Sequence, residues 1–457
     1  TGAVRVSQGE LSLGGQTLVL VGDTRPLVMN GGTLTPASGV VTYSTGTGIT
    51  MTVASTTYYD LITRGSGTYA IDASTTAMND VEVAGGTLNP GSNVLYMGRN
   101  WVTASAGLTT GVTGGIALNG GGSQSVPTQS FGNIMVLKPA GTATFTGNVT
   151  STGALTLNSG TLALGGTILA LNGSSMPFAL NGGTLNAGTS VVTYSTGTGI
   201  TMTMASTSYY ALRFLGAGTY AVNASTTAAN NLDLTLGMLS LGSNNLYVGG
   251  NITNGGTIAT GTTGILELNG GGSQSFPTFT FDTLKVNKPA GAATLTGNVS
   301  STGAVMLSLG TFSLGGFVMD LSGTSTPLVL NGGSLTLANG AISYTTGTGN
   351  SMTVASTTYY NLRFNGAGTY SLNASSTVLN VLTQQTGTLS LGSNQLTLAG
   401  TGTPLVLVGG TFSGGTATTT YSGAGAPNVT GAMYGNLEIT NGNTKTLAAS
   451  STATGDL

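Results

Sequence analysis

The chain has 457 residues with ten basic and twelve acidic side chains, and its formal net charge is −2. Charged residues make up only 5% of the chain, far below the roughly 25% usual for a soluble domain, and the few basic residues are scattered, which excludes the basic stripe that nucleic-acid binding requires. Cysteine and histidine are both absent, which excludes disulfides, thiolate or imidazole metal ligands and histidine-based catalysis.

A period of about 150 residues runs through the chain. The segment 42–48 recurs at 193–199 and, slightly altered, at 343–349. Three prolines occupy matching positions and are separated by 151 and 150 residues: Pro26, Pro177 and Pro327. Long tandem periods are typical of architectures in which each unit buries its apolar face on its neighbours. We therefore expect solenoid repeats at 1–151, 152–301 and 302–457, joined as one continuous rod without linkers.

Short runs of alternating apolar and polar residues follow one another along the whole chain, among them 11–13, 155–157, 162–164 and 312–314. A period of two predicts half-buried strands, and no helical spacing persists for three turns. Glycine-rich pairs such as Gly14-Gly15 lie between the runs and supply the positive φ angles of tight corners.

The three copies also predict which face of a strand is buried. Leu18 and Leu20 correspond to Leu169 and Leu171, then to Met319 and Leu321, while the residue between them changes from Val19 to Ala170 to Asp320. A position that accepts aspartate faces water, so its two neighbours are predicted to face the core.

Equivalent apolar faces return after about 21 to 24 residues, in the series Ile134, Leu155, Phe178, Tyr194 with Ile200, and Leu212. This spacing predicts an all-β parallel β-solenoid with about seven coils per repeat, roughly 21 in total, at the ~4.8 Å spacing of paired strands. Three tandem β-sandwich domains remain the alternative, because turn signals every 8 to 12 residues permit them too.

Six half-units begin with an aromatic residue two or three places before an aliphatic one: 59–61, 131–134, 210–212, 281–284, 360–362 and 434–437. Together with the segment 152–166, they resemble the tandem β-strand repeats of very large exported bacterial surface proteins, including autotransporter passengers and filamentous-haemagglutinin-type adhesins. The resemblance covers the whole chain but is compositional. It implies a class of protein and an extracellular, cell-surface location, without implying a binding site.

Asp80 with Glu82 is the best candidate for a catalytic carboxylate pair, since glycosidases need two carboxyl groups a few ångströms apart. The pair becomes Asn231 with Asp233 and then Val381 with Thr383 in the later repeats. A solvated strand face explains it more simply. We expect no catalytic, cofactor-binding or metal-binding residues.

The remaining acids and two lysines give no stronger candidate. Asp23, Asp282, Glu267 and Asp320 stand alone in sequence, whereas Ca²⁺ needs several oxygen ligands from one loop. Lys138 and Lys288 each precede Pro-Ala-Gly, and Asn441 takes their place in the third repeat once three extra residues are allowed for. We interpret both lysines as solvated turn residues.

Three further patterns have structural interpretations. Asn-x-Ser/Thr sequons, among them those at Asn148, Asn223, Asn251, Asn298, Asn373 and Asn428, are expected by chance in this composition. Gly46-x-Gly48 lacks the context of a nucleotide-binding loop and is predicted to be a turn. The pairs Tyr58-Tyr59, Tyr209-Tyr210 and Tyr359-Tyr360 are expected to place one ring in the core and one outside.

The sequence therefore favours an extracellular structural protein, a segment of a cell-surface fibre, sheath or adhesin stalk. Its expected partners are copies of itself or adjoining repeats, end to end, because residues 454–457 begin the phrase of residues 1–4 again. Surface glycans are a further possible partner. No nucleic acid, membrane insertion or cofactor is expected. A carbohydrate-binding adhesin is the alternative, and a polysaccharide-degrading enzyme is less favoured. Ice binding through arrays such as Thr50-Met51-Thr52 is disfavoured, because those arrays do not recur at every coil.

Overall fold

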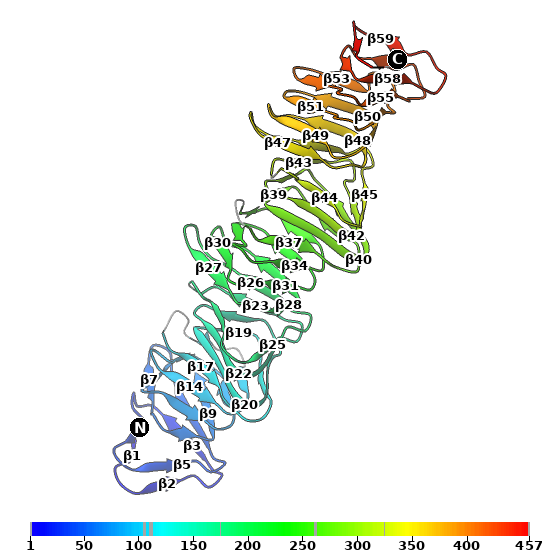
Figure 1. Cartoon of the computed structure of the whole chain (residues 1–457). Helices are drawn as coiled ribbons and strands as arrows, with labels where there is room; N and C mark the ends of the chain where they lie inside the picture. The colour runs from blue at the N-terminus through cyan, green and yellow to red at the C-terminus, as the bar shows by residue number, and fades with distance from the viewer. Residues whose placement is uncertain are drawn as a thin grey trace. The chain divides into compact units, whose positions relative to one another are not determined.

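The computed structural model describes residues 2–103, 107–108, 113–173, 175–259, 263–323 and 325–455. Over these ranges the chain forms a parallel β-solenoid of about 22 turns, called coils below, and contains no helix (Figure 1). Strands of successive coils pair in parallel, whereas β-sandwiches are built from antiparallel sheets. The solenoid prediction is confirmed and the sandwich alternative is wrong.

The coils group into two compact units, residues 1–224 with 235–237 and residues 225–234 with 238–457. The recurrence of the opening phrase at residues 454–457 involves Thr1, Asp456 and Leu457, which lie outside the described residues. The strands of the first unit are β1 (Val4–Val6), β2 (Glu10–Ser12), β3 (Thr17–Val21), β4 (Leu27–Met29), β5 (Thr33–Thr35), β6 (Val40–Thr45), β7 (Thr50–Val53), β8 (Thr57–Tyr58), β9 (Asp60–Gly65), β10 (Thr68–Ile71), β11 (Thr75–Ala77), β12 (Val81–Val83), β13 (Thr87–Asn89), β14 (Val94–Met97), β15 (Trp101–Thr103), β16 (Gly107–Leu108), β17 (Gly115–Leu118), β18 (Gln124–Val126), β19 (Gln129–Phe131), β20 (Asn133–Phe145), β21 (Val149–Ser151), β22 (Leu155–Ala163), β23 (Ile168–Leu171), β24 (Phe178–Leu180), β25 (Thr184–Asn186), β26 (Val191–Tyr194), β27 (Thr201–Met204), β28 (Ser208–Tyr209), β29 (Ala211–Phe214) and β30 (Thr219–Val222).

The second unit is built in the same way. Its strands are β31 (Thr226–Ala228), β32 (Leu232–Leu234), β33 (Met238–Ser240), β34 (Leu246–Val248), β35 (Ile252–Asn254), β36 (Thr257–Ile258), β37 (Ile265–Leu268), β38 (Gln274–Phe276), β39 (Phe279–Phe281), β40 (Thr283–Leu295), β41 (Val299–Ser301), β42 (Val305–Ser313), β43 (Val318–Leu321), β44 (Leu328–Leu330), β45 (Ser334–Thr336), β46 (Ala341–Tyr344), β47 (Ser351–Val354), β48 (Thr358–Phe364), β49 (Thr369–Leu372), β50 (Ser376–Gln384), β51 (Thr388–Ser390), β52 (Leu396–Leu398), β53 (Leu405–Leu407), β54 (Thr411–Ser413), β55 (Thr418–Tyr421), β56 (Asn428–Val429), β57 (Met433–Tyr434), β58 (Asn436–Ile439), β59 (Thr446–Leu447) and β60 (Thr452–Ala453).

Strands at the same position of successive coils form the sheets. In the first unit the main orders are β3-β6-β9-β12-β15, β7-β10-β13-β16 and β8-β11-β14-β17-β20-β22-β24. In the second they are β31-β34-β37-β40-β42-β44, β39-β41-β43-β46-β48-β50-β52-β55-β58 and β47-β49-β51-β54-β57-β60. Because a strand pairs with its equivalent one coil away, each sheet presents one column of side chains to the core and the next to the outside.

The register tests the predicted series of equivalent residues. Ile134 pairs with Leu155 and Leu155 with Phe178, as expected. The rest of the series is wrong: Tyr194 pairs with Leu171 in a neighbouring sheet, and Ile200 is 48% exposed. Coils differ in length. Counting residues at a fixed spacing therefore no longer identifies the sheet to which a residue belongs once a longer coil intervenes.

The predicted strand phase is confirmed. Leu169, Leu171, Met319 and Leu321 are fully buried, Leu20 is 3% exposed and Leu18 is half-buried, whereas Val19 is 56% exposed. The chain closes each coil with tight corners that favour glycine. A Cβ on Gly65, whose φ is +87°, would lie 2.2 Å from the carbonyl oxygen of Thr45 in the preceding coil, so a side chain there would separate the two coils.

Candidate functional site

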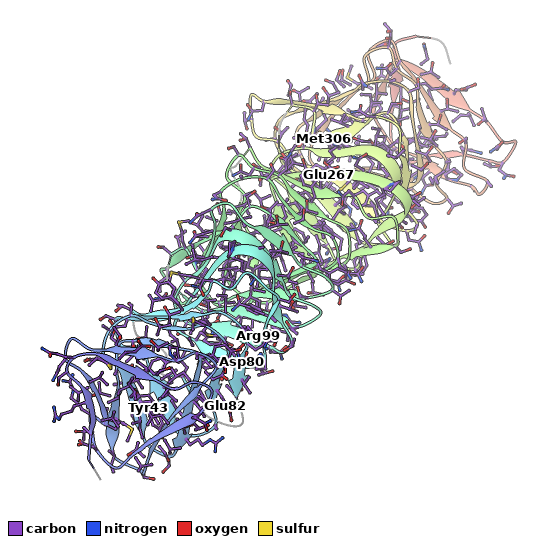
Figure 2. All side chains as sticks on the ribbon, turned by 90° about the horizontal axis from the view of Figure 1, so that it is seen from below. Tyr43, Asp80, Glu82, Arg99, Glu267 and Met306 are labelled. Atoms are coloured by element: carbon purple, nitrogen blue, oxygen red, sulfur yellow. The ribbon has the colours of Figure 1, made fainter. Side chains whose placement is uncertain are left out.

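Asp80 and Glu82 lie at strand β12, and Figure 2 labels both. Glu82 is half-buried on the outward face of the strand. Asp80 comes directly before the strand, where its Oδ1 accepts a hydrogen bond from the backbone N–H of Asn100 at 2.9 Å. Its own N–H donates to Oδ1 of Asp60 at 3.0 Å. The Asp80 carboxylate therefore satisfies a backbone donor of the next coil, a role that amide side chains fill equally well.

Similar side-chain oxygens recur along the corners of other coils. The Oδ1 atom of Asn231 accepts from Asn251 N, and that of Asn251 accepts from Ser275 N. In the same way Asn148 accepts from Ile168 N, and Asn298 from Val318 N. Most of these bonds join residues about 20 positions apart, so the corner of one coil caps the strand of the next. We call these residues the capping ladder.

The ladder explains three of the sequons named above. Asn148, Asn251 and Asn298 belong to it, so structure, as well as chance, places asparagine there. Asn223, Asn373 and Asn428 are exposed residues. Gly46 to Ile49 forms a turn, in which Ile49 N donates to Gly46 O and Gly48 has a φ of +77°, as predicted.

Lys138 is the residue that sequence reasoning placed worst. Its side chain is 1% exposed and lies in the long strand β20. The Nζ atom donates to the carbonyl oxygens of Gly120 and Gly122 at 2.6 and 2.7 Å and to Oε1 of Gln124 at 2.7 Å. Three acceptors match the three N–H donors of an ammonium group.

The Gln124 side chain extends this cluster to a third coil, because its Nε2 atom donates to the backbone oxygens of Met97 and Arg99, both at 2.7 Å. The second unit repeats the arrangement: Lys288 is fully buried and donates to Gly270 O and Gln274 Oε1. We call each cluster a lysine clamp, since one ammonium and one amide tie three coils together. Burial lowers the pKa of both lysines.

The prediction of solvated turn lysines is therefore wrong, and a signal in the sequence would have corrected it. Lys138 has the same parity as Ile134 and Val136, which are both buried, so the alternation itself sends it inward. The placement of Asn441 was better. Its Nδ2 atom donates to Ser422 O in the preceding coil, as Lys138 does to Gly120 O, and Lys445 adds bonds to Gly423 O and Thr440 O.

The single acidic residues contact protein groups near them. Asp23 accepts from Arg25 N, Asp282 from the Thr302 hydroxyl and Asp320 from the Thr345 hydroxyl. Glu267 is 6% exposed; it lies 3.2 Å from Lys285 Nζ and accepts from Asn287 Nδ2 at 2.8 Å. Over the described residues, no group of three acidic side chains is close enough together to hold a metal ion.

The tyrosine pairs divide as predicted. Tyr58, Tyr209 and Tyr359 are buried, while Tyr59, Tyr210 and Tyr360 are half-buried on the outside. Each buried ring meets a second buried tyrosine that alternation did not single out. The hydroxyl oxygens are 2.8 Å apart in Tyr43–Tyr58, and the same contact occurs in Tyr194–Tyr209, Tyr344–Tyr359 and Tyr421–Tyr434.

Each of these phenol pairs is tied to the backbone. Ala54 N donates to the Tyr43 hydroxyl at 3.2 Å, and the Tyr58 hydroxyl donates to Ala54 O at 2.7 Å. Burial raises the pKa of Tyr43 and of Tyr344 to about 12, because a phenolate would lose its hydration inside the core. The phenol pairs thus lock one corner of a coil against two sheets.

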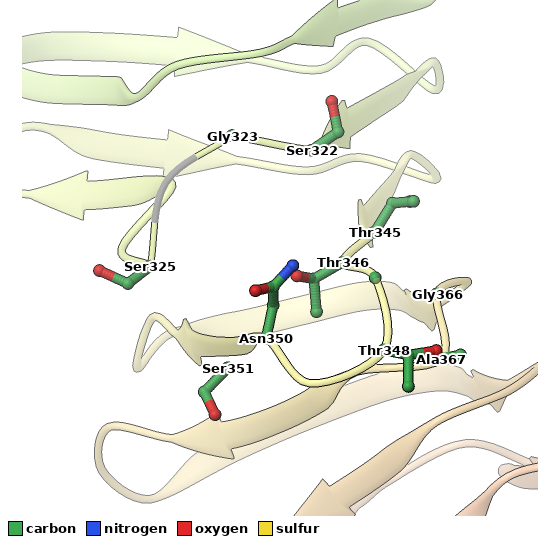
Figure 3. Close-up of a pocket in the computed structure, with 11 residues that line it drawn as sticks. Ser322, Gly323, Ser325, Thr345, Thr346, Thr348, Asn350, Ser351, Gly366 and Ala367 are labelled. Carbon is green, nitrogen blue, oxygen red and sulfur yellow. The ribbon is translucent and has the colours of Figure 1, made fainter.

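A hollow of about 650 Å³ opens on the surface of the second unit (Figure 3). Its lining residues are small and uncharged: Ser322, Gly323, Ser325, Thr345, Thr346, Gly347, Thr348, Asn350, Ser351, Gly366 and Ala367. The Ser322 hydroxyl donates to Ser301 O and the Thr345 hydroxyl to Asp320. The hollow offers hydroxyl and amide groups for hydrogen bonding, and its lining contains neither an aromatic ring nor a titratable side chain.

Comparisons with protein-family models, with curated proteins and with solved structures gave no match. The described residues include no helix with the length and hydrophobicity of a membrane span. The fold and the contacts above are therefore the basis for any functional conclusion.

Proposed function

We propose that this chain is a structural segment of an extracellular surface protein, as in a fibre, sheath or adhesin stalk. One observation carries the proposal: the contacts that recur between repeats are buried and join coil to coil. Among the residues that the structure describes, the phenol pair occurs four times and the lysine clamp twice. Stability in solenoids depends on the interfaces between neighbouring repeats. Contacts that recur at these interfaces are what a stiff, extended stack of coils requires.

The outer surface supports the same proposal. Its polar residues are mainly threonine, serine and asparagine, and charged residues are 5% of the chain. Interactions of an uncharged coat change little with salt or pH, which suits a protein exposed to an uncontrolled medium. The proposal includes two further points. The chain is of the same kind as the tandem-repeat surface proteins that it resembles, such as autotransporter passengers and filamentous-haemagglutinin-type adhesins, and it is located at the cell surface.

End-to-end association is a further part of the proposal. Every coil presents the same kind of parallel ladder to the next, and an unpaired ladder edge is a template for another strand. Adjoining repeats or a second copy would continue the ladder, and repetition of such a contact without closure builds a filament. Light scattering of the purified chain over a range of concentrations tests this part; a monomer at every concentration contradicts it.

The decisive experiment is localisation in the native organism. Antibodies against the purified chain, labelled with gold and applied to unpermeabilised cells, should decorate the surface or fibres that leave it in electron micrographs. Permeabilised cells provide the control. Labelling found only after permeabilisation would contradict the proposal.

A carbohydrate-binding adhesin is the second candidate. The hollow in Figure 3 favours it, because its uncharged hydroxyl and amide groups suit the hydroxyls of a neutral sugar. A glycan array probed with the intact chain and with Asn350→Ala separates the two candidates. Binding that the substitution abolishes would favour the adhesin.

A further inference from the structure

One sheet of the second unit presents an ordered array of hydroxyl groups. Strands β47, β49, β51 and β54 stack in parallel and contribute one outward pair each. Ser351 pairs in register with Thr369, then Thr388, then Thr411; the second column is Thr353, Ser371, Ser390 and Ser413. We call these eight residues the hydroxyl face.

The hydroxyl face is regular in both directions. No register shift interrupts the pairing of these four strands, whereas the neighbouring pair β48–β50 has one between Tyr359 and Asn361. Groups in one column are ~4.8 Å apart, and the columns are ~6.7 Å apart because two residues separate them along a strand. The face is therefore a two-dimensional lattice.

A rigid core supports this lattice. The inward residues between the two columns are Met352, Tyr370, Leu389 and Phe412, and each is 4% exposed or less. The Tyr370 hydroxyl also accepts from Thr346 N and Gly366 N. The positions of the outward side chains are thereby fixed by packing below them.

The hydroxyl groups of the face are available to an external partner. Within the described part of the chain, none of the eight side-chain hydroxyls makes a hydrogen bond to another protein group, although the backbones of these residues do. By contrast, the hydroxyls of Thr302 and Thr454 bond to backbone carbonyls. Each hydroxyl of the face therefore retains a donor and acceptor capacity for solvent.

Charged side chains are also rare in this part of the sequence. Between Asp320 and Glu438 the one charged residue is Arg363, which lies on β48 in a different sheet. Charged groups orient water around themselves and disturb any extended water lattice. A neutral lattice of hydroxyls with interspersed threonine methyl groups does not.

From this geometry we infer that the hydroxyl face binds ice. Water molecules held by hydroxyls that repeat at two fixed spacings form an ordered layer, and such a layer is positioned to join an ice crystal. A crystalline polysaccharide suits the face less, because none of its eight outward residues offers an aromatic ring on which sugars stack. The inference is independent of the proposed cell-surface location.

The first unit shows why sequence alone disfavoured this function. There Thr50, Thr68 and Thr87 form one column, which ends at Gly107 of β16. The second column is Thr52, Ala70 and Asn89, and Asn89 accepts from Gly91 N. A search for Thr-x-Thr fails at those coils. It also misses the second unit, where each of the four strands carries one serine and one threonine, so that both columns consist of hydroxyl residues from β47 to β54.

The test uses the full chain in cold solution. We expect it to lower the freezing point below the melting point, to shape growing ice crystals and, when labelled with a fluorophore, to coat a single ice crystal. Ser371→Tyr with Thr388→Tyr places two rings in the middle of the face and should abolish all three effects. Thr388→Val, which keeps the methyl groups and the shape, should reduce them.

Thr397→Tyr is the matched control, because Thr397 lies outward on β52 in the neighbouring sheet, and it should leave ice binding unchanged. Thermal melting of every variant shows that each remains folded. Freezing unaffected by the intact chain would overturn the inference, as would equal loss in the Thr397→Tyr control. Adsorption to microcrystalline cellulose or chitin without any effect on ice would assign the face to polysaccharide instead.

Discussion

The ammonium group of Lys138 lies 2.7 Å from the side-chain oxygen of Gln124, and this contact is closed to solvent. The same two residue types meet at Lys288 and Gln274, 2.5 Å apart. A cation placed inside a coil stack needs several oxygen partners to replace its hydration. For Lys138 these are the carbonyl oxygens of Gly120 and Gly122 at a corner and the side-chain oxygen of Gln124. The lysine clamp is thus as much a product of the tight corners as of the side chains.

Removal of the clamp cation should destabilise the coils around it. Lys138→Met removes the ammonium donor from Gly120 O and Gly122 O and leaves Gln124 Oε1 with the Gly120 N–H alone, at a cost of about 2–3 kcal/mol. Denaturant unfolding monitored by circular dichroism checks this, with the exposed Arg64→Met as control. Equal midpoints for the two variants would show that the clamp contributes nothing.

The phenol pairs should set an alkaline limit to stability. Tyrosine in an unfolded chain has a pKa near ~10, whereas Tyr43 and Tyr344 have pKa values of about 12 in the fold. The folded pKa is the higher one, so this contribution is complete below pH ~10 and is lost as the pH rises through about 12. As the pH rises through this range, the unfolding midpoint should fall while the phenolate absorbance rises, and the two changes should occur over the same pH interval. Ionisation of the buried phenols without loss of structure would contradict the prediction.

The strand phase predicts a large difference between neighbouring substitutions. Leu171→Asp puts an unpaired charge into a dry core column and should unfold the local coils. Ala170→Asp points outward, at the position that Asp320 occupies one repeat later, and should be tolerated. Thermal melting of the two variants is the measurement, and similar losses would mean that the two faces are assigned wrongly.

The capping ladder predicts that an acceptor oxygen matters more than an amide. Asn148→Ala removes the partner of Ile168 N and should cost about 1 kcal/mol. Asn148→Asp keeps an oxygen at that place and should cost less. Hydrogen exchange of the Ile168 amide, compared between the two variants, reports directly on this bond; equally fast exchange in both would refute the capping role.

Neutralising Asp80 and Glu82 should have no effect on catalysis. Asp80→Asn with Glu82→Gln keeps the oxygen that caps Asn100 N, so the fold should survive. Any polysaccharide-degrading activity of the chain should remain unchanged in reducing-sugar assays. A loss of activity in the folded double variant would make this pair a catalytic centre.

Alternation and internal repetition were enough to predict the solenoid, because period two and a long tandem repeat both follow from backbone geometry. They also placed Leu169 and Leu171 correctly. The series through Tyr194 failed since coils differ in length, and only the paired register shows which sheet a residue belongs to.

The buried polar groups were harder to predict. Lysine is so often exposed that its parity with Ile134 and Val136 was outweighed by its charge. The oxygens that make its burial possible belong to the preceding coil, 14 to 18 residues earlier in the sequence. Tyr43 is 15 residues from Tyr58 in sequence, so their contact depends on how one coil turns. The hydroxyl face depends on four strands between Ser351 and Ser413 and emerges only from their register.

The direction of the capping ladder has a consequence for biosynthesis. In the bonds described above, the acceptor side chain comes first in sequence and the donated N–H about 20 residues later. A chain that emerges from a ribosome or a secretion pore therefore meets acceptors already in place on the coil made just before it. Each folded coil presents acceptors that position the next coil. Folding can therefore proceed coil by coil, from the amino end onward, as fast as the chain is delivered.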